Sequence, residues 1–159
     1  MQHLDLSRVA SEEEIRQQLE EMTALELITP EQARATDIKI ITNFYKSQTG
    51  KRMLAANRIW RELPFNYKKD AREVIKGLSI EGEYLLIQGV IDCCFIEDGK
   101  WILVDYKTDW IADEADIDRV VNNYRVQLDL YAEALEKLTN RPVGEKILYL
   151  LNINRAVHI

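Results

Sequence analysis

The sequence predicts an α/β protein in which helices flank a mixed β-sheet and a helical segment precedes it. Helix-capping signals cluster at the start of the chain. They are followed by β-rich segments around a polar turn, and then by a long helical repeat before a last β-rich segment. Because 159 residues with 47% hydrophobic content suffice for one core, we expect a single domain. Its helical part would cover 1–55 and its α/β core 56–159.

The N-terminal helices are predicted from their capping residues and apolar spacing. Ser11, with a glutamate three positions later, has the pattern of a capping box that begins a helix over 11–23. A second, short helix begins at Thr29-Pro30, because proline suits the first helical turn. Apolar spacing predicts a third helix over 37–47.

Glycine, proline and β-rich patterns predict the elements that follow. Gly50 is expected to break the third helix, with a further short helix at 52–54. Pro64 suits the end of an edge strand. A polar connection is expected over 66–80, and apolar residues at helical spacing predict a helix over 116–138. The four expected strands cover 57–65, 84–96, 101–107 and 147–153.

Two acidic residues mark the hairpin expected from the second and third strands. Asp92 follows Gly89, which lets a backbone or a substrate approach closely, and Asp105 follows four apolar residues. Asp105 and Lys107 are two positions apart on a strand, so their side chains leave the same face. Because charged groups at the end of a buried strand are costly, we expect a divalent cation and an anionic substrate to stabilise them.

These groups match the needs of phosphodiester hydrolysis. That reaction requires charge to be neutralised on the phosphate oxygens and a water to be made nucleophilic, and a metal ion held by carboxylates does both. Asp92 and Asp105 are the expected ligands of Mg²⁺ or Mn²⁺, with the main-chain carbonyl of Tyr106 as a further oxygen donor. Lys107 would stabilise negative charge beside the attacking water or the scissile phosphate.

The long helix and the first strand supply further candidates. Tyr124, Gln127 and Tyr131 share one helix face, where a glutamine is unexpected if the stripe is only core. We expect Gln127 and Tyr131 to position Lys107, the water or the phosphate backbone. Glu62 lies on the first strand, where an isolated glutamate normally faces solvent.

The charge is unevenly distributed along the chain. A net charge of −6 argues against a free-standing DNA-binding protein. Residues 41–80 nevertheless hold nine basic and three acidic residues, which predicts either a solvated surface or a groove that follows phosphates. The basic residues expected to contact DNA are Lys51, Arg52, Arg58 and Arg61.

Composition also bears on the compartment. The only cysteines, Cys93 and Cys94, are neighbours, which suits strand packing better than a disulfide or a metal cluster. The first residues lack the pattern of a signal peptide, and no run approaches the roughly eighteen apolar residues of a membrane span. We therefore expect a cytoplasmic protein that does not contact the membrane.

Taken together, four motifs resemble those of the RecB-family nucleases, which belong to the PD-(D/E)xK phosphodiesterases. The resemblance spans essentially the whole chain, and it is similar in detail to the C-terminal nuclease domain of AddA-type helicase–nuclease subunits, called RexA in some bacteria. The motifs are Glu62-Leu63-Pro64-Phe65, Gly89-Val90-Ile91-Asp92, Asp105-Tyr106-Lys107-Thr108-Asp109 and Tyr124-x-x-Gln127-Leu128-x-x-Tyr131-Ala132.

The resemblance implies a restriction-endonuclease-like core and a role for each matching residue. Asp92 and Asp105 would be the metal ligands and Lys107 the catalytic lysine. The implied activity is that of a Mg²⁺-dependent DNA exonuclease domain in double-strand break repair and recombination. The implied partners are DNA, an upstream ATP-dependent helicase motor in the same polypeptide, and the AddB partner subunit of the AddAB (RexAB) complex.

One departure from the family pattern leads to a further expectation. The family also uses a metal-binding histidine within a Gly-Thr-x-x-His stretch, and no Gly-Thr precedes His3. We therefore expect a C-terminal fragment of a larger helicase–nuclease that binds metal weakly and cleaves little by itself. Two alternatives remain: a nuclease-fold module used for DNA binding or assembly of subunits without cleavage, and a purely structural ion pair at Asp105.

Overall fold

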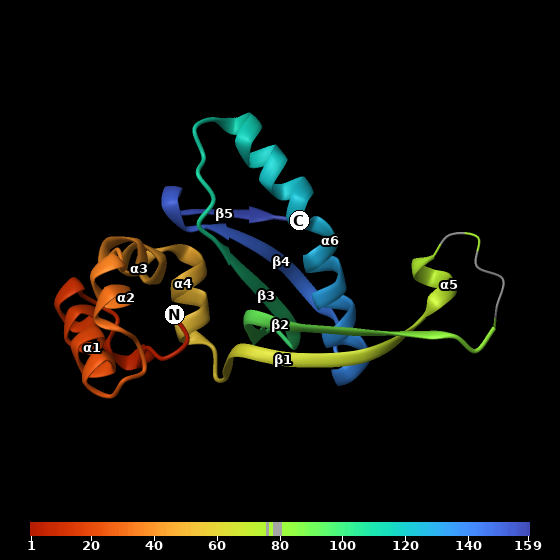
Figure 1. The fold of residues 1–159 in the computed structure, drawn as a ribbon, viewed down its shortest axis with the longest axis horizontal. Helices are drawn as coiled ribbons and strands as arrows, with labels where there is room; N and C mark the ends of the chain where they lie inside the picture. Colours follow the sequence, from red (N-terminus) through yellow and green to blue (C-terminus); the bar gives the residue numbers. More distant parts are fainter. Residues whose placement is uncertain (76, 78–80) are drawn as a thin grey trace.

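In the computed structural model, which describes residues 1–75, 77 and 81–159, the chain folds around a five-stranded sheet (Figure 1). The strands follow one another in the order β1-β2-β3-β4-β5. β3 and β4 are parallel while the other neighbours are antiparallel, so the predicted mixed sheet is confirmed. The strands are β1 (Ile59–Asp70), β2 (Tyr84–Glu97), β3 (Lys100–Lys107), β4 (Val143–Leu150) and β5 (Arg155–His158). The helices are α1 (Glu12–Ala24), α2 (Pro30–Ala35), α3 (Ile38–Lys46), α4 (Gln48–Ala55), α5 (Ala71–Val74) and α6 (Glu114–Thr139), with 3-10 turns η1 (Leu6–Arg8) and η2 (Leu151–Ile153).

Helices cover both faces of the sheet, and each face has its own apolar core (Figure 1). On one face, Phe44 of α3 is buried in the same cluster as Val104 of β3. On the other, Leu128 of α6 is buried with Leu103 of β3. Because side chains alternate along a strand, the odd-numbered residues that follow Leu103 in β3 face α6. No helix in the described part of the chain is long and apolar enough to cross a membrane.

The first three helices begin where the sequence predicts, the first two at the capping residues expected for them. Ser11 and Thr29 each complete a capping box, with Glu14 and Gln32 respectively, and the side chain of Asp37 caps α3. These caps satisfy backbone N–H groups that have no partner within the first helical turn. The predicted positions of α1, α2 and α3 are confirmed.

The prediction that Gly50 breaks the third helix is wrong. α3 ends at Lys46, Ser47 caps α4, and Gly50 lies within the first turn of α4. A Cβ atom on residue 50 would lie 2.1 Å from the carbonyl oxygen of Phe44. The glycine is needed for the close approach of two helices rather than for a break.

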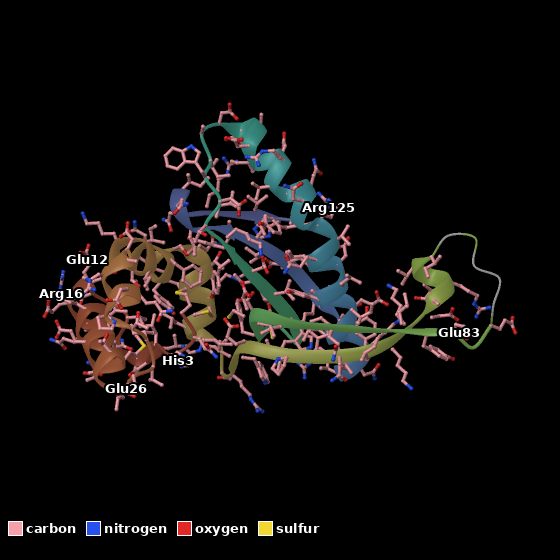
Figure 2. The ribbon with its side chains drawn as sticks, viewed as in Figure 1. His3, Glu12, Arg16, Glu26, Glu83 and Arg125 are labelled. Atoms are coloured by element: carbon pink, nitrogen blue, oxygen red, sulfur yellow. The ribbon has the colours of Figure 1, made fainter. Side chains whose placement is uncertain are left out.

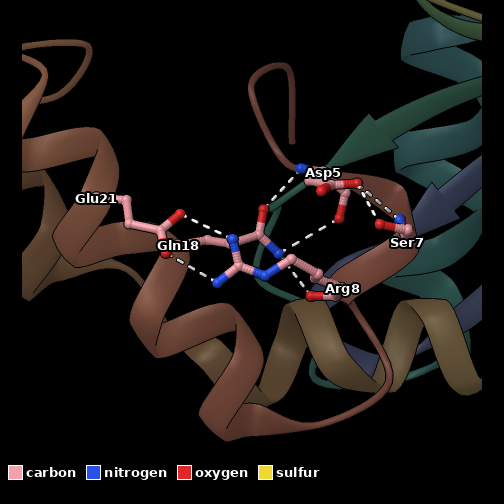
Figure 3. Close-up of polar contacts among 5 residues, drawn as sticks. All are labelled: Asp5, Ser7, Arg8, Gln18 and Glu21. Atoms are coloured by element: carbon pink, nitrogen blue, oxygen red, sulfur yellow. Dashed lines mark hydrogen bonds and ion pairs between the residues drawn. The ribbon is translucent and has the colours of Figure 1, made fainter.

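The segment before α1 is tied to both α1 and the sheet. The amide of Gln18, a residue only 4% exposed, accepts the N–H of Asp5 at 2.6 Å and donates to the carbonyl oxygen of Arg8 at 2.5 Å (Figure 3). Arg61 of β1 donates through Nη1 to the carbonyl oxygens of Met1 at 3.0 Å and Leu4 at 2.6 Å. Arg61 therefore connects the N-terminal segment to β1.

Strand β1 is longer than predicted. The sequence pattern places its end at Pro64 and a polar connection over 66–80, yet pairing with β2 continues to Asp70 opposite Tyr84, and α5 follows. Pro64 is accommodated because β1 is an edge strand of the sheet. Residues 76 and 78–80 of the expected connection lie outside the described residues.

The prediction of one last strand over 147–153 is also wrong. β4 ends at Leu150, η2 follows, and β5 returns antiparallel to β4. Asn154 makes this reversal possible with a φ of +52°, a left-handed conformation that asparagine tolerates better than most residues. The β-rich pattern did not separate the strand from the turn, because both contain branched apolar residues.

The hairpin of β1 and β2 extends beyond the rest of the sheet. Strands β2 and β3 pair from their turn only as far as Cys93 opposite Val104, whereas β1 and β2 remain paired to Asp70 opposite Tyr84. The two-stranded extension leads to α5 (Figure 1). β2 therefore leaves β3 at Asp92.

The packing at Gly50 gives a prediction about stability. Gly50→Ala should lower the free energy of unfolding by about 1–3 kcal/mol, because backbone atoms must move to admit the methyl group. Urea unfolding followed by circular dichroism measures the change. Gly144→Ala is the control, since its added methyl would meet mainly the flexible side chain of Lys100. Equal unfolding midpoints for the two variants would contradict the packing argument.

Candidate active site

The central residues of the predicted site meet where β2 leaves β3. The last pair between these strands, counted from their turn, is Cys93 with Val104. Asp92 and Asp105 are the next residues beyond that pair, and so lie opposite each other. Asp92 Oδ2 accepts the backbone N–H of Tyr106 at 2.9 Å, in place of a hydrogen bond between the two backbones. This bond holds the Asp92 carboxylate beside Asp105.

The carboxylate of Asp105 is buried and poorly satisfied. Asp105 is 1% exposed, and neither of its side-chain oxygens has a hydrogen-bond partner among the described residues. Lys107 Nζ lies 2.5 Å from Oδ2, which is ion-pair distance but not hydrogen-bonding geometry. A buried carboxylate without hydrogen bonds is unfavourable, so this site fits an additional cation.

The pKa of Asp105 reflects this environment. Burial raises the pKa of the carboxyl group above its usual value, the ammonium group of Lys107 lowers it, and the charge of Asp92 raises it again. The net effect is a raised pKa. The folded protein therefore holds the ionised form of Asp105 at a cost, which is typical of functional sites.

Lys107 lies between the sheet and α6. Its Nζ is 4.2 Å from the centre of the Tyr124 ring, a cation–π distance. The hydroxyl of Tyr124 donates to Asp109 Oδ2 at 3.3 Å, which fixes the ring against the end of β3. The Lys107 side chain is 15% exposed, so it is largely but not completely buried.

Gln127 and Tyr131 contact each other on the same side of α6. Gln127 Nε2 donates to the Tyr131 hydroxyl at 2.6 Å, so the proton of that hydroxyl remains free to be donated elsewhere. The Tyr131 ring packs edge-on against Phe65 with centroids 5.5 Å apart. A Cβ on Gly89 would lie 2.7 Å from Phe65 and 3.2 Å from Tyr131, so two side-chain rings approach Gly89 closely, in place of the predicted backbone or substrate.

Glu62 lies in β1 at the level of Asp92, but the register of the two strands does not pair these residues. Its neighbours Arg61 and Leu63 pair with Cys93 and Ile91, and its own side chain is exposed. A φ of +50° places Glu62 in the left-handed region, which is uncommon and costly for residues other than glycine. The structure thus brings Glu62 into the same row of the sheet as Asp92 and Asp105, but at the exposed edge.

The four basic residues predicted to contact DNA lie in different environments. Arg52 Nη2 pairs with Glu97 at 2.5 Å and with Glu145 at 2.7 Å, and the guanidinium of Arg61 is held by backbone carbonyls. Lys51 and Arg58 are exposed and have no carboxylate partner in the described part of the chain. Lys51 and Arg58 can therefore meet a phosphate without breaking an ion pair, although the guanidinium of Arg58 also lies over the Trp60 ring at 4.7 Å.

The ligand set of the site is small. Within residues 1–75, 77 and 81–159, no three His, Cys, Asp or Glu side chains gather as a potential metal centre. His3 is exposed on the N-terminal segment (Figure 2). Two carboxylates nevertheless suit Mg²⁺, which keeps several waters and is commonly held by one or two carboxylates together with substrate phosphates. The unsatisfied oxygens of Asp105 fit such an ion.

Comparison with known proteins decides the family. A sequence model described as the PD-(D/E)XK nuclease superfamily matches residues 1–157, nearly the whole chain. The chain belongs to the PD-(D/E)XK nuclease superfamily. The mixed sheet flanked by helices is consistent with the restriction-endonuclease-like fold of this superfamily.

Curated relatives share much of the sequence. The A subunit of the ATP-dependent helicase/nuclease from Alkaliphilus metalliredigens is 48% identical over 158 residues, which are 99% of this chain and 13% of that protein. The protein of the same name from Acetivibrio thermocellus is 46% identical over 153 residues, which are 94% of this chain and 12% of that protein. The chain therefore spans about 13% of the length of the curated relatives it matches.

Sequence reasoning missed several contacts around the PD-(D/E)XK residues. The bond from Tyr106 N–H to Asp92 depends on where β2 leaves β3, which the local pattern does not show. Asp109 has a role beyond its place in the motif, because it fixes Tyr124. Asn152 Nδ2 donates to the carbonyl oxygen of Thr108 at 2.7 Å, a contact between segments far apart in the sequence with no signal in either.

The unfavourable burial of Asp105 can be tested without metal. Asp105→Asn should leave the free energy of unfolding unchanged or raise it, because the raised pKa shows that the folded state disfavours the charged form. Urea unfolding at pH 7 in a chelating buffer measures it. Asp70→Asn is the control, and it should lose stability, because Arg72 lowers the pKa of Asp70 to about 2. A loss of about 3 kcal/mol or more in Asp105→Asn would instead identify a structural ion pair.

Proposed function

We propose that the chain is the metal-dependent nuclease domain of a DNA helicase–nuclease and that it hydrolyses DNA as an exonuclease in double-strand break repair and recombination. The observation that carries the proposal is the buried carboxylate of Asp105, which has no hydrogen-bond partner within residues 1–75, 77 and 81–159 and lies beside Asp92 and Lys107. Membership of a nuclease superfamily and the names of the relatives support it.

Asp92, Asp105 and the carbonyl oxygen of Tyr106 would hold Mg²⁺ or Mn²⁺. Oxygen donors of this kind suit hard divalent cations. When bound, the ion supplies charge neutralisation at the phosphate and lowers the pKa of a coordinated water. The hydrogen bond from Tyr106 N–H fixes the orientation of Asp92 before any ion arrives, so little reorganisation is needed.

The ammonium group of Lys107 would lie beside the phosphate and stabilise the negative charge that develops there. Its ammonium group pairs with Asp105 and faces the Tyr124 ring. To serve both roles it moves from Asp105 Oδ2 toward the substrate. The free proton of the Tyr131 hydroxyl, oriented by Gln127, would donate to a phosphate oxygen or to the water. Glu62, at the exposed edge of the sheet, would have a less direct role than these residues in positioning the attacking water.

DNA would reach the site along the surface formed by the basic residues of 41–80. Lys51 and Arg58 are the proposed phosphate contacts, because both are exposed and lack carboxylate partners in the described residues. Arg52 and Arg61 would instead stabilise the fold. Arg52 does so through its ion pairs with Glu97 and Glu145, and Arg61 through hydrogen bonds to backbone carbonyls. Charge on the phosphates makes such contacts strongly dependent on salt.

The longer setting of the domain is proposed from its relatives. Since the chain spans about 13% of their length, we place residues 1–159 as one nuclease domain in a larger polypeptide. An ATP-driven helicase motor would precede it, and the AddB protein of an AddAB (RexAB) complex would be its partner. Such a complex would act in the cytoplasm, where the DNA is. By itself the chain would bind metal weakly, because it lacks the Gly-Thr-x-x-His stretch that supplies a histidine ligand in the family.

One observation favours a second function, a nuclease-fold module that binds or assembles without cleaving. Asp105 is only 1% exposed and is covered by the ammonium group of Lys107. In an active site this lysine leaves the carboxylate when a cation binds. In an inactive module it would remain in place. The two functions therefore differ in whether the Lys107 ammonium group leaves Asp105 when a divalent cation is supplied.

Replacing Lys107 separates metal binding from cleavage. Lys107→Met should bind Mn²⁺ at least as tightly as the parent chain, because a competing positive charge is removed, which calorimetry measures. The same change in the larger helicase–nuclease should lower DNA cleavage roughly a hundredfold to a thousandfold while ATP hydrolysis continues. Lys100→Met, at the opposite end of β3, is the control. Unaltered cleavage in Lys107→Met would favour a different catalytic group.

The proposed phosphate contacts are tested by their salt dependence. Lys51→Ala with Arg58→Ala should weaken binding of the chain to an oligonucleotide and reduce the slope of log K against log salt by about 1–2. Fluorescence anisotropy at several salt concentrations gives the slope. Arg52→Ala should lower thermal stability instead and leave the slope unchanged. A reduced slope in Arg52→Ala, with an unchanged slope in the Lys51→Ala and Arg58→Ala double variant, would show that Arg52 is the phosphate contact instead.

A further inference from the structure

The side chain of Asn152 joins the turn after β4 to the segment that follows Lys107. Its Nδ2 donates to the carbonyl oxygen of Thr108 at 2.7 Å and to that of Asp109 at 3.2 Å. Asn152 lies in η2, between β4 and β5, and η2 lies beside the end of β3 (Figure 1). Asn152 belongs to none of the four nuclease motifs.

Regular pairing of β3 ends where the contacts of Asn152 begin. At this end β3 is no longer paired with β2, and its last pair with β4 is Lys107 with Leu150. Thr108 and Asp109 therefore lie beyond the ladder of backbone hydrogen bonds, and Asn152 donates to the carbonyl group of each. The amide of Asn152 thus extends the attachment of β3 to the β4 side of the sheet past the lysine.

The contacts of Asn152 reach the lysine through Asp109. Asp109 Oδ2 accepts the hydroxyl of Tyr124 at 3.3 Å, and the centre of the Tyr124 ring is 4.2 Å from Lys107 Nζ. A shift in the backbone of Asp109 would move its carboxylate, and with it the ring against which the ammonium group lies. Asn152 is therefore connected to Lys107 through successive contacts from amide to carbonyl, carboxylate to hydroxyl, and ring to ammonium.

The stability of the fold gives little reason for this arrangement. Asn152 and Thr108 are exposed, and a hydrogen bond that replaces one with water contributes little net stability. Geometry matters more in an active site, because a displacement of about 1 Å can lower a rate about a hundredfold. A contact of this kind is therefore better suited to fixing the position of a reacting group than to holding the fold.

We propose that Asn152 is a positioning residue for the Lys107 ammonium group. It acts through the hydrogen bond between Asp109 and Tyr124. The proposal rests on the proposed nuclease function, in which Lys107 stabilises charge on the phosphate. When Lys107 moves from Asp105 toward the substrate, the Tyr124 ring stays beside the ammonium group and limits where it goes. Asn152 fixes the segment to which that ring is bound.

The environment of Lys107 tests the proposal without metal, DNA or cleavage. The ε-methylene group of Lys107 is one bond from Nζ, so the ring current of Tyr124 should displace its NMR signals from those of a solvated lysine. Asn152→Asp has nearly the same shape but no donor, and it places a carboxylate against two carbonyl oxygens. In this variant the Lys107 signals should move toward the solvated position. Proton–carbon correlation spectra of the chain with isotope-labelled lysine measure the change, and Lys107→Met identifies the signals.

Asn154→Asp is the matched control. It adds the same charge to the same turn and keeps the oxygen that accepts the Tyr149 hydroxyl at 2.7 Å, so the Lys107 signals should stay in place. Tyr124→Leu removes the ring and sets the scale of the change. Asn152→Ala removes the donor without adding charge and should displace the signals in the same direction. It also repeats the test if the aspartate variant does not fold.

DNA cleavage by the larger helicase–nuclease is the second readout. Asn152→Asp should lower kcat for cleavage about 10- to 100-fold, with little change in KM and with ATP hydrolysis intact, because the lysine is displaced while no group that contacts DNA is removed. Asn154→Asp should cleave DNA as the parent does.

Two results would overturn the positioning role. One is a set of Lys107 signals that stay in place in both Asn152→Asp and Asn152→Ala, which would leave Asn152 as a structural contact of the turn. The other is displaced signals with unaltered cleavage in a helicase–nuclease that cleaves DNA. Failure of the nuclease function is separate, because the parent protein would then not cleave DNA at all, while the spectra still decide whether Asn152 positions Lys107.

Discussion

The buried carboxylate of Asp105 is the constraint around which this structure is organised. A charged group loses its hydration on burial, and in the described part of the chain neither oxygen of this carboxylate finds the hydrogen bonds that usually compensate. The ion pair with Lys107 offsets part of that loss, yet burial still raises the pKa of the carboxyl group. Hydrophobic residues of similar volume would stabilise a sheet at least as well. Stability alone therefore does not account for a carboxylate and a lysine at these positions.

The sheet creates this environment by letting two of its strands separate. β3 stays paired with β4 along its length, while β2 leaves it after Cys93 and continues with β1 alone. Asp92 occupies the point of separation and bonds to the backbone of β3 through its side chain. α6 then covers this opening with Tyr124 and Tyr131, the latter packed close to Gly89. The separation of β2 from β3 thus brings the two carboxylates, Lys107 and the aromatic residues of α6 together.

Local signals in the sequence were sufficient for much of the fold. Capping boxes at Ser11 and Thr29 act within a few residues, so they predict helix starts correctly. The alternation of side chains on a strand likewise places Asp105 and Lys107 on one face. In both cases the determining interaction lies within the segment itself, and the resemblance to a nuclease family rests on motifs made of such residues.

Features set by distant contacts were not predictable in the same way. Gly50 has the local pattern of a helix break, but its true reason, the carbonyl oxygen of Phe44, belongs to another helix. Arg52 and Arg61 resemble DNA contacts in the sequence because their partners, Glu97, Glu145 and the backbone of the first residues, are brought near only by folding. The sequence around a basic residue is the same whether its side chain is solvated or pairs with a partly buried carboxylate.

The most direct test of the central claim is a crystal structure of the chain soaked in saturating Mn²⁺, with anomalous scattering used to locate the ion. We expect a peak between the carboxylates of Asp92 and Asp105, about 2.0–2.3 Å from an oxygen of each, with the Lys107 ammonium moved away from Oδ2. An ion bound elsewhere, or Lys107 still on Asp105 with no peak there, would contradict the account.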